Sequence, residues 1–294
     1  MKRIITKAIV IIALISLVAT LAVGFASCGG QKDPDKLYVG LECAYSPFNY
    51  TQRDNSNGAV QIYNTNYKPI RRSYANGYDV MIAQKIADEL GKELVIVKME
   101  WDALIPAVQA GSVDLIIAGM SPTAERKEEI DFSDAYYQSN LVLVVRKDGE
   151  YANANSLADF NGAKVAAQQG TFHDAALEQQ GPNHGITRHT PLADFPALIN
   201  ALNTKAIDAY VAEEPGAIEN CASNPDFTYV RLKNNTTGFT ASDEDTAIAV
   251  GVKKNSNLTA QINAILAKIT QSQRDEMMQR AISLASGTNI VPEE

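Results

Sequence analysis

The sequence has few of the residues that build disulfide frameworks and metal sites. It contains three cysteines and three histidines among 294 residues. Two of the cysteines, Cys43 and Cys221, lie beyond the N-terminal segment; they are too few for a disulfide framework and are not at metal-ligand spacing. The histidines are spread over a loop-rich stretch without the close pairing of zinc motifs: His173, His184 and His189. We therefore expect ordinary thiols, surface or loop histidines, and neither a metal nor a cofactor.

Positive charge is scarce as well. The chain has 26 lysines and arginines against 34 acidic residues, and three of the positive charges, but no negative one, lie in residues 1–27. Without that segment the formal net charge falls from −8 to −11. A chain this acidic is a poor partner for nucleic acid, so we expect no such partner.

One long apolar run is present, at the N-terminus. Lys2, Arg3 and Lys7 precede a nearly unbroken apolar stretch over residues 8–25. This order is typical of an export signal. The stretch ends in Phe25-Ala26-Ser27-Cys28, which resembles the lipobox of bacterial lipoproteins, with Phe25 in place of the usual Leu. In that family the peptide is cut before the cysteine, whose thiol then carries a diacylglyceryl group.

The resemblance implies a signal peptide over residues 1–27, a lipid anchor at Cys28 and a polar tether over residues 28–36. An uncleaved membrane helix and plain secretion are the alternatives. All three interpretations place the rest of the chain outside the cytoplasm. The first predicts a protein anchored by lipid to the outer face of the cell membrane, or a periplasmic one.

The chain beyond the signal is too long for the commonest size of a single domain, so we expect two lobes. Strand-like apolar runs alternate with helix-period segments, which predicts mainly parallel sheets covered by helices. A polar, turn-rich stretch over residues 51–76 is expected to be a surface excursion. We predict strands over residues 37–41, 94–99 and 113–118, a helix over 80–90, and a helix from a cap at Asp102 to a stop at Gly111.

The sequence repeats a pattern at an offset of 94 residues. Both copies run from an aromatic residue through a helix and a turn to Asp and a strand; chance similarity of this common unit is the alternative. A true repeat gives two similar lobes whose strands end at Gly119 and Glu213, and ligands of open parallel sheets bind beyond such strand ends. The paired residues are Trp101, Ala103, Leu104, Ile105, Ala107, Val108, Asp114, Ile117 and Ala118 with Phe195, Ala197, Leu198, Ile199, Ala201, Leu202, Asp208, Val211 and Ala212.

Residues that follow the two strand ends indicate the ligand class. The segment over 119–123 offers backbone groups and two hydroxyls, and Arg126 follows with a planar fork suited to a carboxylate. At the other strand end, Glu213 and Glu214 offer acceptors for an ammonium group. A positive group on one side and negative groups on the other match a zwitterion. The alternative is that Arg126 belongs to a solvated charged face with its neighbours over 125–129.

Six motifs in order resemble the polar amino acid family of bacterial extracellular solute-binding proteins (family 3), the receptors of ABC importers. The resemblance covers the whole chain after the signal. The motifs are Glu42-Cys43-Ala44-Tyr45-Ser46-Pro47-Phe48, Gly77-Tyr78-Asp79-Val80, the run from Asp114 to Arg126, Asp131-Phe132-Ser133-Asp134-Ala135-Tyr136-Tyr137, Gln169-Gly170-Thr171 and the run from Asp208 to Pro215.

The resemblance implies roles for residues at the matching positions. Arg126 would hold the α-carboxylate of a free amino acid, helped by Ser121 and by the amides near Thr171. Glu213 would hold the α-ammonium group with the Gly119 carbonyl and the Ser121 hydroxyl, although the family often has Asp at this position.

The resemblance also implies how the ligand side chain is held. Tyr45 and Tyr78 would sandwich it, with core packing as the alternative for both rings. Glu42 stands where the family often has an acidic residue that contacts a polar or cationic side chain. The resemblance therefore implies Arg, Lys, His or Gln as the ligand and favours a basic amino acid among them.

The fold implied by the resemblance is a two-lobed α/β fold of the type II periplasmic-binding-protein kind with two crossover strands. Lobe one would comprise residues 37–138 and 247–294, with C-terminal helices over 258–284, and lobe two residues 139–246. Crossovers are expected near 136–140 and 245–248. Such a protein binds by hinge closure as a monomer and presents its closed form to a membrane permease.

Two other functions are compatible with this fold. Some proteins of the fold resemble dehydratases, and Glu213 could donate a proton if burial raised its pKa. The sequence shows no nucleophile, metal or base constellation, so we expect no enzyme. A ligand sensor for a receptor is the second alternative, although no transmembrane or signalling segment follows Glu294.

Overall fold

The computed structural model describes residues 32–287, of which residues 33–287 belong to one compact unit. The predictions of a signal peptide, of an anchor at Cys28 and of most of the tether lie outside the described residues. Within them, no helix has the length and apolar character needed to cross a membrane.

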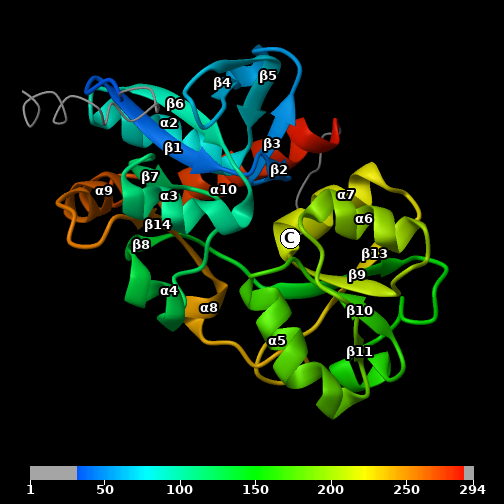
Figure 1. The fold of residues 1–294 in the computed structure, drawn as a ribbon. Coiled ribbons are helices and arrows are strands. Elements are labelled where there is room, and N and C mark those ends of the chain that lie inside the picture. The colour runs from blue at the N-terminus through cyan, green and yellow to red at the C-terminus, as the bar shows by residue number, and fades with distance from the viewer. Residues whose placement is uncertain (1–31, 288–294) are drawn as a thin grey trace, which may run out of the picture. The chain divides into compact units, whose positions relative to one another are not determined.

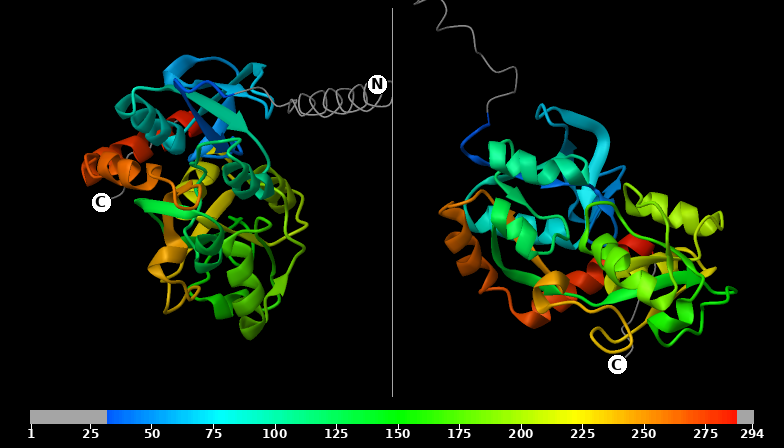
Figure 2. Two further views of the ribbon diagram at one scale, coloured as in Figure 1. Left: turned by 60° about the vertical axis from the view of Figure 1, so that its left-hand side comes forward. Right: turned by 60° about the horizontal axis from the view of Figure 1, so that its bottom comes forward.

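The strands form two sheets, one in each lobe (Figures 1 and 2). The large sheet contains β1 (Lys36–Leu41), β2 (Ala44–Tyr45), β3 (Asn49–Gln52), β4 (Val60–Tyr63), β5 (Pro69–Asn76), β6 (Glu93–Lys98), β7 (Leu115–Ile116), β8 (Asp131–Gln138) and β14 (Ala247–Val252). The small sheet contains β9 (Leu141–Arg146), β10 (Lys164–Ala166), β11 (Thr187–Arg188), β12 (Ala209–Glu213) and β13 (Phe227–Arg231). Their spatial orders are β2-β3-β5-β4-β6-β1-β7-β14-β8 and β11-β10-β12-β9-β13.

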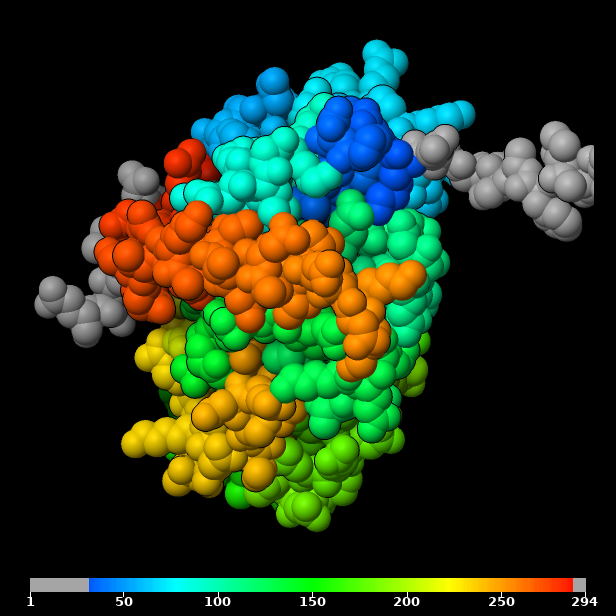
Figure 3. Space-filling view, turned by 90° about the vertical axis from the view of Figure 1, so that its left-hand side faces the viewer, coloured from blue at the N-terminus to red at the C-terminus, as the bar shows by residue number. Residues whose placement is uncertain are grey.

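Helices cover both sheets. The α-helices are α2 (Tyr78–Glu89), α3 (Leu104–Ala110), α4 (Ala124–Glu129), α5 (Phe172–Gln180), α6 (Phe195–Asn203), α7 (Glu214–Ser223), α8 (Asp243–Thr246), α9 (Leu258–Leu266) and α10 (Gln271–Ser286). Short 3-10 turns are η1 (Ser56–Gly58), η2 (Trp101–Ala103), η3 (Leu157–Phe160) and η4 (Gly181–His184). Of the C-terminal helices, α9 contacts β8 and α2 of lobe one and lies across the face shown in Figure 3. α10 contacts α2 of lobe one and also α7 of lobe two.

Both sheets are mixed rather than mainly parallel. β1 pairs in parallel with β6 and β7, and β10 with β11 and β12, but β14 and β9 join their sheets antiparallel. The polar stretch over residues 51–76 is also more than a surface excursion, because β4 and β5 extend the large sheet and bury Ile62 and Ala75 completely. Because β4 pairs with the buried strand β6, the few apolar residues of these mainly polar segments pack into the core. The overall composition of the segments does not indicate this.

The chain passes between the lobes twice. β8 ends at Gln138 and β9 begins at Leu141, and the chain returns through α8 directly into β14. The described strands of the large sheet thus lie before residue 139 or after residue 246, and those of the small sheet lie between these positions.

The internal repeat corresponds to a repeated local structure. Asp114, before β7, accepts a hydrogen bond from the Tyr38 amide (2.9 Å) and donates its own amide to the Tyr38 carbonyl (2.7 Å). Asp208, before β12, makes the same two bonds with Lys164, at 3.0 and 2.8 Å. In each lobe the Asp therefore ties the strand that follows it, β7 or β12, to the strand that runs parallel beside it, β1 or β10.

Two local predictions need correction. Asp102 caps no helix, because it lies inside the turn η2, and α3 begins after Ala103 without a side-chain cap. The end of α3 is as predicted: Gly111 follows the helix in the left-handed conformation (φ 77°). The buried run over 113–118 yields a strand only at β7, because its neighbour β14 pairs with just two of its residues and the chain turns at Gly119 (φ +63°).

Candidate functional site

A cavity between the lobes brings together the two predicted strand ends. It measures about 20 Å³, which is space for about one water molecule. Six of the eight predicted site residues line it: Tyr45, Gly119, Ser121 and Arg126 from lobe one, and Thr171 and Glu213 from lobe two. The other lining residues are Trp101, Gln168, Phe172, His173 and Phe195.

Gly119 lies against the Tyr45 ring, so no larger residue fits there. A Cβ on Gly119 would stand 2.9 Å from Tyr45 Cε1, and the positive φ disfavours any side chain. Below it, the buried Asp79 carboxylate accepts from the Gly119 amide, from Asn49 Nδ2 (2.8 Å) and from the Tyr136 hydroxyl (2.7 Å). The motif at 77–80 therefore positions the strand end through Asp79.

Arg126 points into the cleft from α4. Its exposed fraction is 9%, and its guanidinium donates to the Ser121 carbonyl (2.9 Å) and, across the cleft, to the Gly170 carbonyl (3.0 Å). The Trp101 indole also donates to the Gly170 carbonyl (3.1 Å). Burial lowers the pKa of Arg126 to about 10, so it remains a cation at neutral pH, and no carboxylate among residues 32–287 forms an ion pair with it. The solvated-face alternative is therefore wrong for Arg126.

Glu213 is the last residue of β12 and lines the same cavity as Arg126. It is 5% exposed, and its carboxyl group accepts from the Tyr45 hydroxyl and lies 3.0 Å from His173 Nε2. Burial raises the pKa of Glu213 to about 8 and lowers the pKa of His173 to about 3. The contact with His173 is thus a hydrogen bond to a neutral imidazole rather than an ion pair.

His173 was not predicted as a site residue, and the expectation of a surface or loop histidine is wrong for it. It lies in the first turn of α5 with an exposed fraction of 6%. Thr171 caps this helix by accepting from the Asp174 amide (3.4 Å), which turns the start of α5 toward the cleft. No sequence pattern pairs His173 with Glu213, because the two are brought together by separate elements of lobe two.

Glu42 lies next to the cavity, behind Gln168. It follows β1 directly, is 5% exposed, and its Oε1 accepts from Gln168 Nε2 of the other lobe (2.9 Å). The same amide nitrogen donates to the Ala193 carbonyl (3.1 Å), which fixes the orientation of the Gln168 side chain. Burial raises the pKa of Glu42 to about 7, and nearby acidic residues add to this.

The structure does not place Tyr78 at the cavity. Tyr78 begins α2, is fully buried, and donates its hydroxyl to the Tyr136 carbonyl (2.9 Å) within the core of lobe one. Two rings stack on Tyr45, Phe195 with centroids 4.1 Å apart and Phe48 with centroids 4.9 Å apart, and of these only Phe195 is in the lining. Trp101 and Phe172 are the further unpredicted aromatic residues of the lining. The internal repeat, which pairs Trp101 with Phe195, was the signal that could have found these two residues.

Glu214 is also directed away from the cavity. It begins α7 and forms an ion pair with Arg231 on the far side of the strand end. Glu213 is therefore the acidic residue of this pair that can meet an ammonium group.

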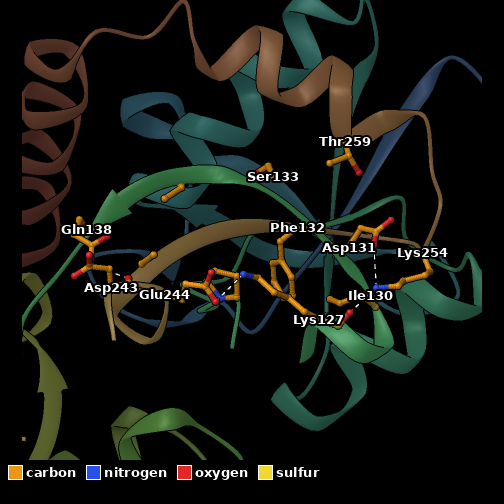
Figure 4. Close-up of a pocket in the computed structure, with 13 residues that line it drawn as sticks. Lys127, Ile130, Asp131, Phe132, Ser133, Gln138, Asp243, Glu244, Lys254 and Thr259 are labelled. Atoms are coloured by element: carbon orange, nitrogen blue, oxygen red, sulfur yellow. Dashed lines mark hydrogen bonds and ion pairs between the residues drawn. The ribbon is translucent and has the colours of Figure 1, made fainter. Parts of the chain in front are cut away.

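A larger cavity of about 650 Å³ lies near the crossover strands and holds none of the predicted residues (Figure 4). Its two lysines are paired, Lys127 with Glu244 (2.8 Å) and Lys254 with Asp131 (3.1 Å). The interlobe cavity therefore remains the candidate site.

The model of the bacterial extracellular solute-binding proteins, family 3, matches residues 37–282. The chain belongs to this family. The solute-binding protein is 28% identical to the arginine-binding extracellular protein ArtP of Bacillus subtilis, over 89% of this chain and 91% of ArtP. It is also 28% identical to the glutamine-binding protein GlnH of the same organism, over 94% and 97%.

A solved structure supports the fold. The amino acid ABC transporter substrate-binding protein of Streptococcus pneumoniae bound to L-arginine superposes with a TM-score of 0.71 at 29% identity, over 85% of this chain and 94% of that one. The two-lobed α/β prediction is thereby confirmed. This solute-binding protein is the substrate-binding component of an amino acid ABC transporter. Its family is extracellular or periplasmic. The homologues named here are amino acid-binding proteins and not enzymes.

Proposed function

We propose that this solute-binding protein captures a free basic amino acid, with arginine as the preferred ligand. The observation that carries the proposal is the set of three buried ionisable side chains around one cavity: Arg126, Glu213 and Glu42, none more than 9% exposed. One cation and two carboxyl groups complement a ligand with one carboxylate and two cationic groups. The similarity to ArtP and to the arginine-bound streptococcal protein supports the same ligand.

Arg126 and Thr171 would hold the α-carboxylate. The Arg126 fork now donates to two carbonyl groups, and a carboxylate is a stronger acceptor that can take both N–H groups at once. The backbone amides after Thr171, at the start of α5, and the Ser121 side chain lie in the same lining and would add donors.

Glu213 would hold the α-ammonium group. The Tyr45 hydroxyl and the His173 imidazole now occupy its carboxyl oxygens, so the ligand would displace or share these contacts. The Gly119 carbonyl and the Ser121 hydroxyl are the further acceptors that the lining offers to the remaining N–H groups.

The ligand side chain would lie among Tyr45, Trp101 and Phe195 and reach toward Gln168 and Glu42. Aromatic faces attract a flat guanidinium through cation–π contacts. A buried carboxyl group at the far end favours a cationic ligand, since desolvating a positive side chain is tolerable when an opposite charge meets it. Arginine meets both conditions, whereas lysine, histidine and glutamine each meet them in part.

Ligand entry would require the lobes to separate. The cavity of about 20 Å³ is far smaller than an amino acid, and cross-lobe hydrogen bonds close it at Gly170 and at Glu42. Separation about the two crossovers would open it, and closure over the ligand would present the form that a permease recognises. We further propose that the protein acts as a lipid-anchored monomer.

A thermal-shift screen of the purified protein against the proteinogenic amino acids tests the proposal. A ligand that binds only the folded state raises the melting temperature by mass action, so arginine should give the largest shift. A larger shift with glutamine or with an acidic amino acid, or no shift at all, would reject arginine as the ligand.

A further inference from the structure

Two buried carboxyl groups beside the cavity have neutral hydrogen-bond partners. Glu213 is bonded by the Tyr45 hydroxyl and contacts His173 Nε2 at 3.0 Å, and Glu42 is bonded by the Gln168 amide at 2.9 Å. Both carboxyl groups are 5% exposed, and no lysine or arginine among residues 32–287 forms an ion pair with either. Burial without a cationic partner favours the neutral, protonated form of a carboxyl group.

The groups around Glu42 reinforce this effect. Asp194 at the start of α6, and Glu100 and Asp102 at η2, are all acidic and raise the pKa of Glu42 further, to about 7. Against this, the Gln168 amide is the one partner that favours the ionised form. Glu42 therefore changes its charge near neutral pH.

Around Glu213, the facing groups are Tyr45 from β2, His173 from α5 and Arg126 from α4. His173 stays neutral because it is buried near Arg126 and because its Nδ1 has no hydrogen-bond partner in the described structure. His173 and Glu213 both belong to lobe two, so their contact does not depend on closure of the lobes. The pKa of Glu213 is raised to about 8.

We propose that capture of a basic amino acid is coupled to proton release, with one proton leaving Glu213 and a second leaving Glu42. This inference rests on the proposed function, since it requires a ligand with a cationic group at each end. The α-ammonium group meets the first carboxyl group and the cationic side chain the second. A neutral amino acid would release only the proton of Glu213.

The protons pass to the solvent. Each O–H bond of a carboxyl group breaks, the electron pair stays on the carboxylate, and the ligand cation takes the place of the proton as its charge partner. Transfer of the proton from Glu213 to His173 is unfavourable for two reasons. The resulting imidazolium would be close to two other cations, the ligand ammonium group and Arg126, and the Nδ1–H group of His173 would have no hydrogen-bond partner. The bound site then holds two carboxylates against the two ligand cations, and Arg126 against the ligand carboxylate.

The proposal fixes the direction in which the affinity for arginine changes with pH. In the closed, ligand-free form both carboxyl groups have pKa values raised above those of exposed ones, so this form is protonated at pH 6, whereas under the proposal the ligand-bound form is not. Affinity for arginine should therefore rise with pH and level off above the higher pKa. We expect the Kd to fall by at least about fivefold between pH 6 and pH 7.5.

Calorimetry of arginine binding at pH 6.5 in buffers with different ionisation enthalpies counts the released protons. We expect more than about one proton per arginine, because both carboxyl groups are mostly protonated at this pH. Glu42→Gln removes one of them, so its count should be at most about one. Glu89→Gln, the same change at an exposed residue of α2, is the matched control and should keep the count of the unmodified protein.

The outcomes separate the two proposals. Arginine binding with a flat Kd from pH 6 to pH 7.5 and no proton release would overturn proton coupling and leave the proposed function standing. Release that Glu42→Gln does not reduce would overturn the assignment of a second proton. Absence of arginine binding at every pH would reject both.

Discussion

The guanidinium of Arg126 lies over the indole ring of Trp101, with its Cζ 5.1 Å from the ring centroid. Both side chains come from lobe one, and both donate a hydrogen bond to the same carbonyl, that of Gly170 in lobe two. Trp101 thus fixes the guanidinium from its face while the Gly170 carbonyl and the Ser121 carbonyl fix it in its plane. In the closed, ligand-free form the guanidinium is therefore held in one orientation.

Substitutions of Trp101 separate these two contributions. Trp101→Phe keeps a ring beneath Arg126 but loses the hydrogen bond to Gly170, and it should weaken arginine binding by about 0.5–1.5 kcal/mol. Trp101→Ala also loses the cation–π contact and the ring surface beside the ligand, so its loss should be larger. Titration calorimetry measures both, and equal losses for the two variants would show that the ring itself contributes nothing.

Arg126→Ala should abolish detectable amino acid binding while the protein stays folded. Loss of a buried, bidentate partner for a carboxylate costs on the order of 2–5 kcal/mol in affinity. Arg231→Ala, which removes an arginine with an ion pair to Glu214 outside the cavity, is the matched control and should bind normally. Near-normal affinity of Arg126→Ala would remove this residue from the site.

Glu42→Gln should change the choice of ligand more than the ability to bind. Arginine should lose more than about 1 kcal/mol, the scale of a charge-assisted hydrogen bond, whereas glutamine should lose much less. Side-by-side titration of arginine, lysine, histidine and glutamine against both forms of the protein is the measurement. Equal losses for all four ligands would exclude Glu42 from specificity.

The predicted anchor can be tested apart from the cleft. Cys28→Ser should release the protein from the membrane fraction without changing its affinity for arginine, because the lipid would be joined to the chain before the first strand. Cys221→Ser, at a partly buried thiol, controls for the loss of a cysteine. Retention of the Cys28→Ser protein in the membrane would indicate an uncleaved helix.

Much of the fold and part of the site could be predicted because they depend on local order along the chain. Hydrophobic spacing predicted α2 and β6, the family resemblance implied the C-terminal helices, and the repeated Asp before a buried strand marked β7 and β12. The carboxyl ends of these strands then placed Gly119 and Glu213, and with them Arg126, at one cleft. β7 and β12 each run parallel to a neighbouring strand, β1 and β10, so the expectation of a site beyond their carboxyl ends depended only on this local pairing and not on the direction of every strand.

Only the tertiary structure decided which side chains turn toward that cleft. Tyr78 and Trp101 are both aromatic residues at the start of a helical segment, yet packing against Tyr136 buries the first while the second faces Gly170 of the other lobe. His173 contacts Glu213 only because the start of α5 packs beside the end of β12. Gln168 contacts Glu42 only because the segment before α5 in lobe two meets the end of β1 in lobe one. The charge state of both carboxyl groups follows from this burial, since desolvation depends on every neighbour that excludes water and not on the residues adjacent in sequence.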